Sequence, residues 1–370
     1  MRRAAPIAAR MLVLIALAGA VALLACHSDG VLGPADLGPR STSRVLAGSV
    51  KAPVVTVTAL DAVGRCTYSW AAAINPAGQV VGGCETNQGT YAVLWHDGTM
   101  IDLGTLGGNA SLAFGINSAG RVVGWSGTIG DLHTHAFLWD KGVMTDLGAL
   151  NASGWSEAHA INSAGQVVGA ASTSNEWRSH AVLWRNGVIM DLGTLGGQDS
   201  EAMDINSAGV VVGYSGALTD QEPQIEATHA FIWKNGAMTD LGTLGGLYSR
   251  AVAINDAGQV VGVSEASNGE SHAFLWEKGV MTDLGTLGGT YSEASGINPA
   301  GQVVGHGLTG TGAQHAFLWE KGVMTDLGTL GAATGHDYGS GARDINPAGQ
   351  IVGTCSSSAW EAVATKWSVK

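Results

Sequence analysis

A nine-residue motif recurs along the chain and restricts its fold more than any other feature of the sequence. The motif reads I-N-x-A-G-x-[VI]-V-G, and successive copies begin 42 to 49 residues apart. The copies begin at Ile74, Ile116, Ile161, Ile205, Ile254, Ile297 and Ile345. A repeat of this period indicates an architecture in which each unit packs only against its neighbours, so the chain needs no single large core.

Two further motifs recur in step with the first. One reads H-A-F-L-W, with variants, and the other reads M-x-D-L-G, with variants. The first of these ends at Trp95, Trp139, Trp184, Trp233, Trp276, Trp319 and Trp367. The second contains Asp102, Asp146, Asp191, Asp240, Asp283 and Asp326. The Ile-Asn and Trp motifs therefore occur seven times, whereas the Asp motif occurs six times.

Each unit contains four strand-like segments. They are the run into Ile-Asn, the V-V-G segment, the H-A-F-L-W segment and the V-M-T-D-L segment. Pairs such as Lys278-Gly279 and Asn235-Gly236 separate the third segment from the fourth, and such pairs favour two-residue hairpin turns. No stretch after the N-terminal apolar run has a sustained helical period. Four antiparallel strands per unit predict an all-β fold, a β-propeller with one blade per unit.

The two ends of the chain predict how the ring closes. The chain stops three residues after Trp367, so the last unit lacks its fourth strand. The β-branched run from Val54 to Leu60 precedes the first unit and can fill that place. We therefore expect a seven-bladed β-propeller, closed by pairing of the N-terminal strand with the C-terminal blade. An open β-solenoid is the alternative, but it would need capping repeats, which the sequence lacks.

A histidine recurs at the first position of the H-A-F-L-W motif. A two-residue turn places Phe274 opposite Asp283, with His272 within diagonal reach of that aspartate. The histidines are His135, His180, His229, His272 and His315, and their aspartates are Asp146, Asp191, Asp240, Asp283 and Asp326. A ring of metal sites is one interpretation. We favour a structural role, because metal ligands must converge on one point whereas these residues recur once per blade. The sequence predicts no metal and no cofactor.

Composition excludes one class of partner. The formal net charge is −12, and no Lys/Arg cluster follows the N-terminal segment, so we expect no nucleic-acid partner. Glycine accounts for 56 of the 370 residues, and its periodic placement indicates turns rather than disorder.

The N-terminus has the pattern of an export signal. Three arginines precede an apolar run from Met11 to Ala25, which is too short for a membrane-spanning helix of ~20 residues. The next residues are rich in Gly, Pro and Ser, with little apolar periodicity. We predict a signal peptide at 1–25, a flexible linker at 26–52 and the repeat domain at 53–370.

The end of the apolar run, Leu23-Leu24-Ala25-Cys26, resembles a bacterial lipobox. The resemblance implies that the thiol of Cys26 receives a diacylglyceryl group, which would hold the protein on a membrane. Ordinary cleavage near Ala25, with Cys26 as an unmodified thiol, is the alternative. His27, at the position where aspartate would indicate inner-membrane retention in some bacteria, favours the outer membrane or cell surface.

The repeat itself resembles a known family. The order H-A-F-L-W-x-x-G-x-M-x-D-L-G-T-L-G-G, followed by I-N-x-A-G-x-V-V-G, is similar to the HAF repeats of bacterial extracellular proteins. The resemblance covers residues 54–370, and the segments ending at Trp95 and Trp367 depart from the consensus. It implies an extracellular repeat protein but no activity and no catalytic residues.

Residues that break the repeat symmetry are the candidates for binding. The connections between V-V-G and H-A-F differ most, at 8 to 15 residues, and we expect them to form loops at one rim of the ring. A different strand phase would move them to the other rim. The candidates are Trp125, Asp131, His133, Trp177, Tyr214, Asp220, Glu222 and Trp360.

Three cysteines remain beyond the lipidation site. Cys66 and Cys84 flank one hairpin turn, and an exported location permits a disulfide. We predict a Cys66–Cys84 disulfide, with Cys355 as a competing partner for Cys84.

The sequence favours a monomeric binding or scaffold propeller at the cell envelope, with a glycan or a protein as ligand. The alternative is an enzyme, a lyase or hydrolase that acts on polysaccharide, which would need converging carboxylates that the sequence does not identify. A matrix component without a specific ligand is the third hypothesis.

Overall fold

Strands account for nearly all regular structure in the computed structural model, which describes residues 55–60, 66–131, 133–173, 178–218, 226–329, 339–358 and 361–369. The predicted signal peptide, the lipidation site Cys26 and the 26–52 linker lie outside the described residues. Among the described residues, no helix is long and apolar enough to cross a membrane. The prediction of an all-β chain is confirmed.

The strands occupy four recurring positions. First-position strands are β2 (Tyr68–Ile74), β6 (Gly107–Ile116), β10 (Ser156–Ile161), β14 (Gly196–Ile205), β18 (Gly245–Ile254), β22 (Gly288–Ile297) and β26 (Ser340–Ile345). Second-position strands are β3 (Val80–Thr86), β7 (Val122–Thr128), β11 (Val167–Ser172), β15 (Val211–Leu218), β19 (Val260–Ala266), β23 (Val303–Thr309) and β27 (Gln350–Ser358). Third-position strands are β4 (Gly89–His96), β8 (Thr134–Asp140), β12 (Ser179–Arg185), β16 (Glu226–Lys234), β20 (Ser271–Glu277), β24 (Gln314–Glu320) and β28 (Glu361–Val369). Fourth-position strands are β5 (Thr99–Asp102), β9 (Val143–Asp146), β13 (Val188–Asp191), β17 (Ala237–Asp240), β21 (Val280–Asp283) and β25 (Val323–Asp326).

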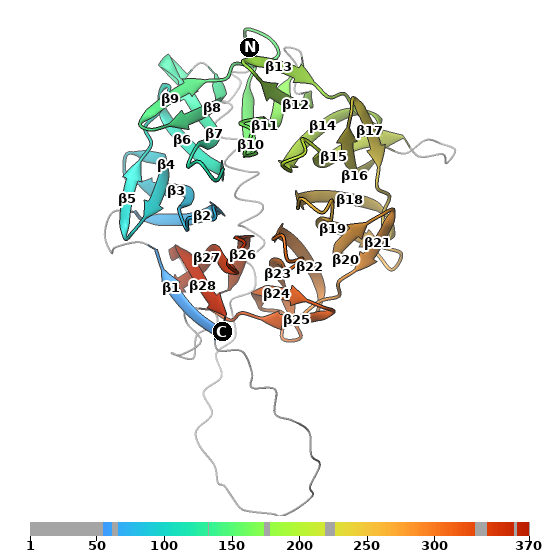
Figure 1. Cartoon of the computed structure of the whole chain (residues 1–370). Coiled ribbons are helices and arrows are strands. Elements are labelled where there is room, and N and C mark those ends of the chain that lie inside the picture. The colour runs from blue at the N-terminus through green and yellow to red at the C-terminus, as the bar shows by residue number, and fades with distance from the viewer. Residues whose placement is uncertain are drawn as a thin grey trace, which may run out of the picture.

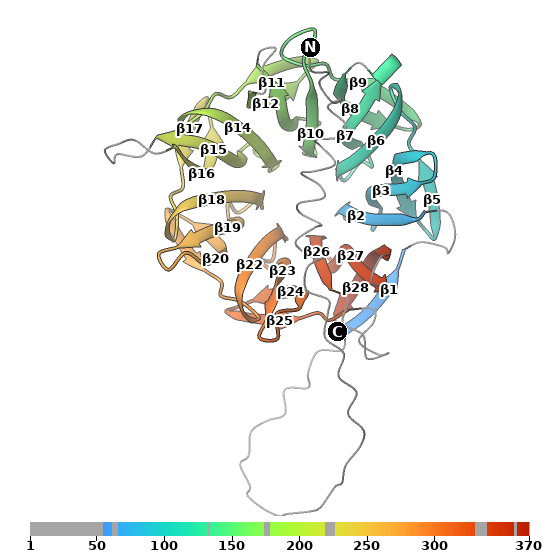
Figure 2. The same cartoon turned by 180° about the vertical axis from the view of Figure 1, so that it is seen from behind.

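These strands form antiparallel four-stranded units arranged around a central axis, as in a β-propeller (Figures 1 and 2). The first-position strands lie innermost and the fourth-position strands lie at the periphery (Figure 1). One sheet contains twelve strands because the single parallel bridges Thr228↔Tyr248 and Ser271↔Tyr291 join three neighbouring units. Each unit thus corresponds to one sequence repeat.

The N-terminal strand β1 (Val55–Ala59) pairs with the last strand of the chain. The ladder is antiparallel and runs from Val55↔Val369 to Ala59↔Thr365. The resulting sheet has the order β1-β28-β27-β26. Blue β1 therefore lies beside red β28 at the place where a fourth-position strand would otherwise stand (Figure 1).

The hairpins between third and fourth strands have the register that the turn chemistry predicts. Phe274 pairs with Asp283 and Trp276 pairs with Met281. The turn residues Lys278 and Gly279 have φ of 52° and 89°, as a type I′ turn requires.

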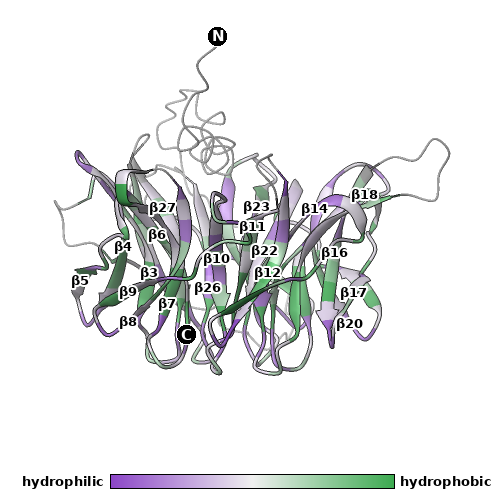
Figure 3. Cartoon of the chain, turned by 90° about the horizontal axis from the view of Figure 1, so that it is seen from above, coloured by the Kyte–Doolittle hydropathy of each residue, from purple (hydrophilic) through white to green (hydrophobic). Residues whose placement is uncertain are grey.

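The hydrophobic cores lie between neighbouring units. One cluster combines Val212 and Ala230 of one unit with Ala251, Val260 and Phe274 of the next. Phe274 is fully buried, and burial of such a side chain contributes about 1.5–3 kcal/mol. Hydrophobic stretches within the strands alternate with more hydrophilic ends (Figure 3). Each unit therefore depends on its neighbours for its core.

A series of hydrogen bonds connects the repeat asparagines around the axis. Each side-chain amide donates to the backbone carbonyl of the next asparagine at 3.1 to 3.4 Å, and the last, Asn346, donates to the first, Asn75. The side-chain oxygen accepts from the chain four residues later, as Asn162 does from Gln166 N. The series comprises Asn75, Asn117, Asn162, Asn206, Asn255, Asn298 and Asn346. Every one of these residues is buried.

Loss of one member of this series is expected to destabilise the chain. Asn162→Ala removes the donor to Asn206 O and the acceptor of Gln166 N. Leaving buried groups without partners costs about 1–3 kcal/mol. Urea unfolding of the full chain should show this loss, whereas Asn268→Ala, on an exposed turn, should change stability by less than about 0.5 kcal/mol. Equal midpoints for the two variants would contradict the role of the asparagine series.

The structure joins Cys66 and Cys84 in a disulfide, with a Cα–Cα distance of 5.3 Å. Cys355 is buried within a different core cluster, beside Ile345 and Trp367. The competing pairing through Cys355 is therefore absent from the structure.

Peptide mapping without reduction is expected to recover Cys66 and Cys84 in one linked species. The bond spans 18 residues, so its reduction should lower stability by about 3 kcal/mol. A linked peptide that contains Cys355 would contradict this pairing.

Candidate functional site

An invariant frame with a variable centre recurs in the first-position strands. Its sequence is S-x-A, and both the serine and the alanine are buried in every copy. The serine ties neighbouring units together, because Ser156 Oγ accepts from Ala136 N at 2.9 Å and donates to Gly148 O at 2.7 Å. The variable residues are Trp70, Leu112, Glu157, Glu201, Arg250, Glu293 and Gly341.

A β-bulge follows the frame in the first-position strands. In β10 the register shifts between Ala158 and Ala160, so His159 has no cross-strand partner. The carbonyl oxygen of Glu157 points at Gly169, where an added Cβ would lie only 2.0 Å from it. This approach explains why the repeat keeps a glycine in V-V-G. Glu157 and His159 are two residues apart in β10, and their side chains lie together at 3.4 Å.

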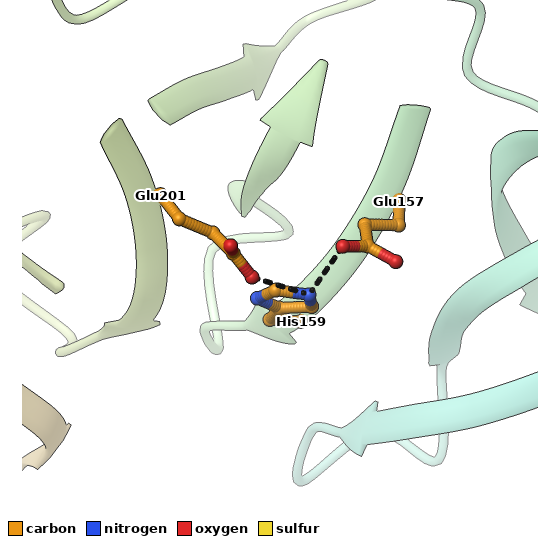
Figure 4. A group of neighbouring side chains, drawn as sticks. All are labelled: Glu157, His159 and Glu201. Atoms are coloured by element: carbon orange, nitrogen blue, oxygen red, sulfur yellow. Dashed lines mark ion pairs between the residues drawn. The ribbon is translucent and has the colours of Figure 1, made fainter. Parts of the chain in front are cut away.

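The adjacent first-position strands β10 and β14 bring together three side chains that can bind a metal ion. Glu157 and His159 belong to β10, and Glu201 belongs to β14. His159 Nε2 lies 3.4 Å from Glu157 Oε1 and 3.4 Å from Glu201 Oε1. Figure 4 shows the imidazole between the two carboxylates. Within the described residues, no other group of three His, Cys, Asp or Glu ligand atoms lies within 4.8 Å of one another.

Burial opposes the charged form of His159, but the two glutamates outweigh it and raise its pKa to about 9. Burial also raises the pKa of Glu201, which accepts a hydrogen bond from the Tyr214 hydroxyl. Burial and the adjacent Glu201 carboxylate raise the pKa of Tyr214. The hydroxyl therefore stays protonated and donates to the carboxylate.

The charged side chains continue into the next two units. Arg250 forms an ion pair with Glu293 and lies 6.0 Å from the ring centroid of Tyr214. Burial raises the pKa of Glu293, but Arg250, His306, the Tyr291 hydroxyl and Arg343 together outweigh it and lower the pKa to about 2. The Tyr291 hydroxyl donates to Glu293 at 2.6 Å. We call the set Glu157, His159, Glu201, Tyr214, Arg250, Tyr291, Glu293 and His306 the charged belt.

Aromatic residues precede the frame at the start of several first-position strands. Trp155 is half-buried, whereas Tyr68 and Tyr248 are 36% and 37% exposed. The V-V-G strands end at the same edge, since Gly196 at the start of β14 pairs with Ala217 near the end of β15. The variable connections leave from that edge, which we call the entry rim.

The structure corrects two of the predicted loop residues. Trp125 lies within β7, paired with Leu112 and Ala136, and Tyr214 lies within β15, paired with Glu201. The prediction that these side chains belong to loops is wrong, because the second-position strands extend past the V-V-G segment. Asp131 ends the short 3₁₀ turn Ile129–Asp131, and the ring of His133 stacks on His135 at 6.3 Å. The other four candidates, Trp177, Asp220, Glu222 and Trp360, lie outside the described residues.

The repeat histidines lie away from the belt, on third-position strands. Each Nδ1 lies 2.6 to 2.8 Å from the aspartate of its own unit. The same aspartate accepts from a glycine N–H two residues later, as Asp146 does from Gly148. These two contacts of the aspartate hold the start of the connection to the next unit in place.

Sequence reasoning missed Glu157, His159, Glu201, Arg250 and Glu293. The signal was present, because alignment of the repeats shows charged residues between an invariant serine and an invariant alanine. Because the residue between the serine and the alanine varies while both neighbours stay fixed, the packing of the units does not restrict its side chain.

His306 of the belt should make stability depend on pH. Burial lowers its pKa to about 4, so between about pH 6.5 and 4 the unfolded chain binds more protons. Its contribution to stability is therefore lost as the pH falls through this window. His306→Gln should reduce the difference in melting temperature between pH 7 and pH 5 by about 2–4 °C. A control at His96, which is 42% exposed, should keep the wild-type difference, and an unchanged difference in His306→Gln would refute the assignment.

Comparisons with known proteins support the fold. A family model described as a protein of unknown function (DUF3466) matches residues 197–330. No curated protein matches the chain. A puromycin-hydrolyzing peptidase of Mycobacterium tuberculosis has a TM-score of 0.53 at 14% identity, over 78% of this chain and 50% of the peptidase.

Two other solved structures match less well. The β-propeller domain of the Trilobed protease from Pyrococcus furiosus has a TM-score of 0.38 at 10% identity, over 71% of this chain and 96% of that domain. The Aleuria aurantia lectin has a TM-score of 0.37 at 12% identity, over 82% of this chain and 94% of the lectin. This chain spans half the length of the peptidase, and the likeness concerns the fold alone.

Proposed function

We propose that this chain is an exported lipoprotein whose propeller binds a glycan at the entry rim. In this proposal residues 1–25 are a signal peptide, Cys26 carries the lipid, and residues 26–52 link it to the domain. The lipobox-like sequence and the HAF-type repeat support a location at the bacterial outer membrane or cell surface, where the protein is proposed to be a monomer. The membrane is then a partner through the anchor alone.

We also propose that the domain is a seven-bladed ring closed by β1. Three separate contacts support closure between the first and last repeats. β1 pairs with β28, the Ser69 side chain accepts from Ala364 N at 3.0 Å, and Asn346 donates to Asn75 O. The β1–β28 ladder repeats the pairing of third and fourth strands within a unit, and the other two contacts repeat those found between consecutive units.

The observation that carries the binding proposal is the position of the residues that differ between repeats. They occur at one place in the innermost strands and contact one another from unit to unit, as Arg250 contacts Glu293. A scaffold without a ligand would gain nothing from half-buried charges on its inner face, because each loses hydration there. Their concentration indicates a surface that is built for a polar ligand.

The chemistry of the entry rim favours a sugar. Exposed rings of Tyr68 and Tyr248 lie at the rim, and rings of this kind present a flat apolar face with a polar tip. Carboxylate and guanidinium groups follow two residues later along the first-position strands, further from the rim. Hydroxyl groups of a glycan can both donate to the carboxylates and accept from Arg250.

The alternative function is an enzyme that cleaves or eliminates within polysaccharide. Glu157 and Glu201 are the carboxylate pair that such chemistry would use. His159 Nε2, however, lies 3.4 Å from an oxygen of each carboxylate and occupies the space between them. A glycosidic bond has no room there, so the geometry favours binding over hydrolysis.

A glycan array tests this proposal. The full chain, purified in detergent, should bind a defined subset of glycans. Tyr248→Ala should weaken that binding by about tenfold or more, as the loss of one stacking residue does. Tyr91→Ala is the matched control, because Tyr91 lies on the third-position strand β4, further from the axis than the first-position strands (Figure 1), and its hydroxyl donates to Gln88 O. The proposal fails if no glycan binds, or if both variants bind as the wild type does.

A further inference from the structure

We propose that Glu157, His159 and Glu201 bind a divalent transition-metal ion between neighbouring units of the propeller. The inference does not depend on the glycan proposal. It departs from the expectation that the sequence carries no metal site, which concerned the repeat histidines of the third-position strands.

The orientation of His159 is the first argument. Its Nδ1 lies 3.1 Å from the carbonyl oxygen of Ala202, and only a protonated Nδ1 can donate to a carbonyl. The Nε2 atom therefore faces the two glutamates. A metal-bound histidine typically has this arrangement, with its second nitrogen fixed by a backbone carbonyl.

The distances are the second argument. Nε2 lies 3.4 Å from one oxygen of each glutamate. A charged hydrogen bond between such groups is shorter, about 2.7–2.9 Å, so neither contact of Nε2 has the length of a direct charged hydrogen bond. Ligand atoms at about 2.0–2.2 Å from a tetrahedral ion lie about 3.3 Å apart. The two spacings from Nε2 match those of atoms that share an ion, and all three ligand atoms lie within 4.8 Å of one another.

The surroundings of the ligands are the third argument. Tyr214 donates to Oε2 of Glu201, which leaves Oε1 facing His159. The ring of Phe114 meets the imidazole edge to face at a centroid distance of 5.6 Å. Such contacts hold Glu201 and His159 in one orientation before the ion arrives, which is what supporting residues do in metal sites.

Solvent access and ligand type define the ion. The side chains of Glu157, His159 and Glu201 are 13%, 11% and 19% exposed, so the three ligands retain some contact with solvent. One imidazole and two carboxylates suit Zn²⁺, Mn²⁺, Fe²⁺ or Co²⁺, whereas Cu⁺ prefers sulfur ligands and Ca²⁺ prefers six to eight oxygens. The site therefore belongs to the zinc-like class with three protein ligands.

Metal uptake by the untagged full chain tests the proposal. After treatment with a chelator and its removal, the protein should bind one equivalent of Zn²⁺ by mass spectrometry of the metal. Co²⁺ should give a visible absorption spectrum of low-coordinate nitrogen and oxygen ligation, a readout that requires no activity. If the protein binds neither Zn²⁺ nor Co²⁺, the proposal is overturned. The cluster would then be an imidazolium held by two carboxylates.

Variants locate the site. His159→Gln and Glu201→Gln nearly preserve side-chain volume and should weaken Zn²⁺ binding by about tenfold or more. His180→Gln is the matched control, because His180 belongs to the same unit as His159 but pairs with Asp191 on the outer strands. Undiminished Zn²⁺ binding in His159→Gln, or an equal loss in His180→Gln, would refute the assignment. If a variant fails to fold, the Co²⁺ spectrum of the wild-type protein still decides whether a site of this ligand type exists.

Discussion

The hydrogen bonds between successive asparagines are the constraint on which the rest of the structure depends. Each buried side-chain amide accepts a hydrogen bond from a backbone N–H of the turn that follows it and donates one to the backbone carbonyl of the next asparagine. Asn162, for example, accepts from Gln166 N and donates to Asn206 O. Buried polar groups without partners are costly, so every unit must place this turn at the same distance from the axis. That requirement fixes the innermost strand, and the remaining strands of each unit follow outward from it by short hairpins.

A second constraint acts beside the β-bulge of the first-position strands. It explains why these inner strands can hold functional side chains. The carbonyl of the variable frame residue approaches the V-V-G glycine so closely that no side chain fits there, as between Glu201 and Gly213. The serine and alanine of the frame fill the space between units. Because these backbone and small-residue contacts complete the packing, the side chain between them is free to vary. The repeat thus stays regular while the variable position of its frame carries glutamate in three units and arginine in one.

The outer parts of the fold could be predicted from the sequence because they depend on local chemistry. The Lys278-Gly279 turn, the pairing of Phe274 with Asp283, and the reach of His272 to that aspartate follow from turn type and strand alternation. The candidate site could not be predicted in the same way. The sequence places Trp125 and Tyr214 in loops because no local signal marks where the second strand ends. The length of that strand is set by its pairing with the first strand. The belt itself joins residues from different repeats, which only the arrangement of the units brings together.

The sequence by itself determined the repeating unit, its four strands, its turns and the residues that must be buried. These features arise from periodicity, glycine placement and hairpin geometry, which act over a few residues. Only the tertiary structure decided which variable side chains meet. His159 and Glu201 are 42 residues apart in the chain, yet their side chains come within 3.4 Å because they lie on the first-position strands of adjacent units, β10 and β14. Such proximity depends on the rotation between neighbouring units, a quantity that the packing of whole sheets sets and that no local pattern encodes.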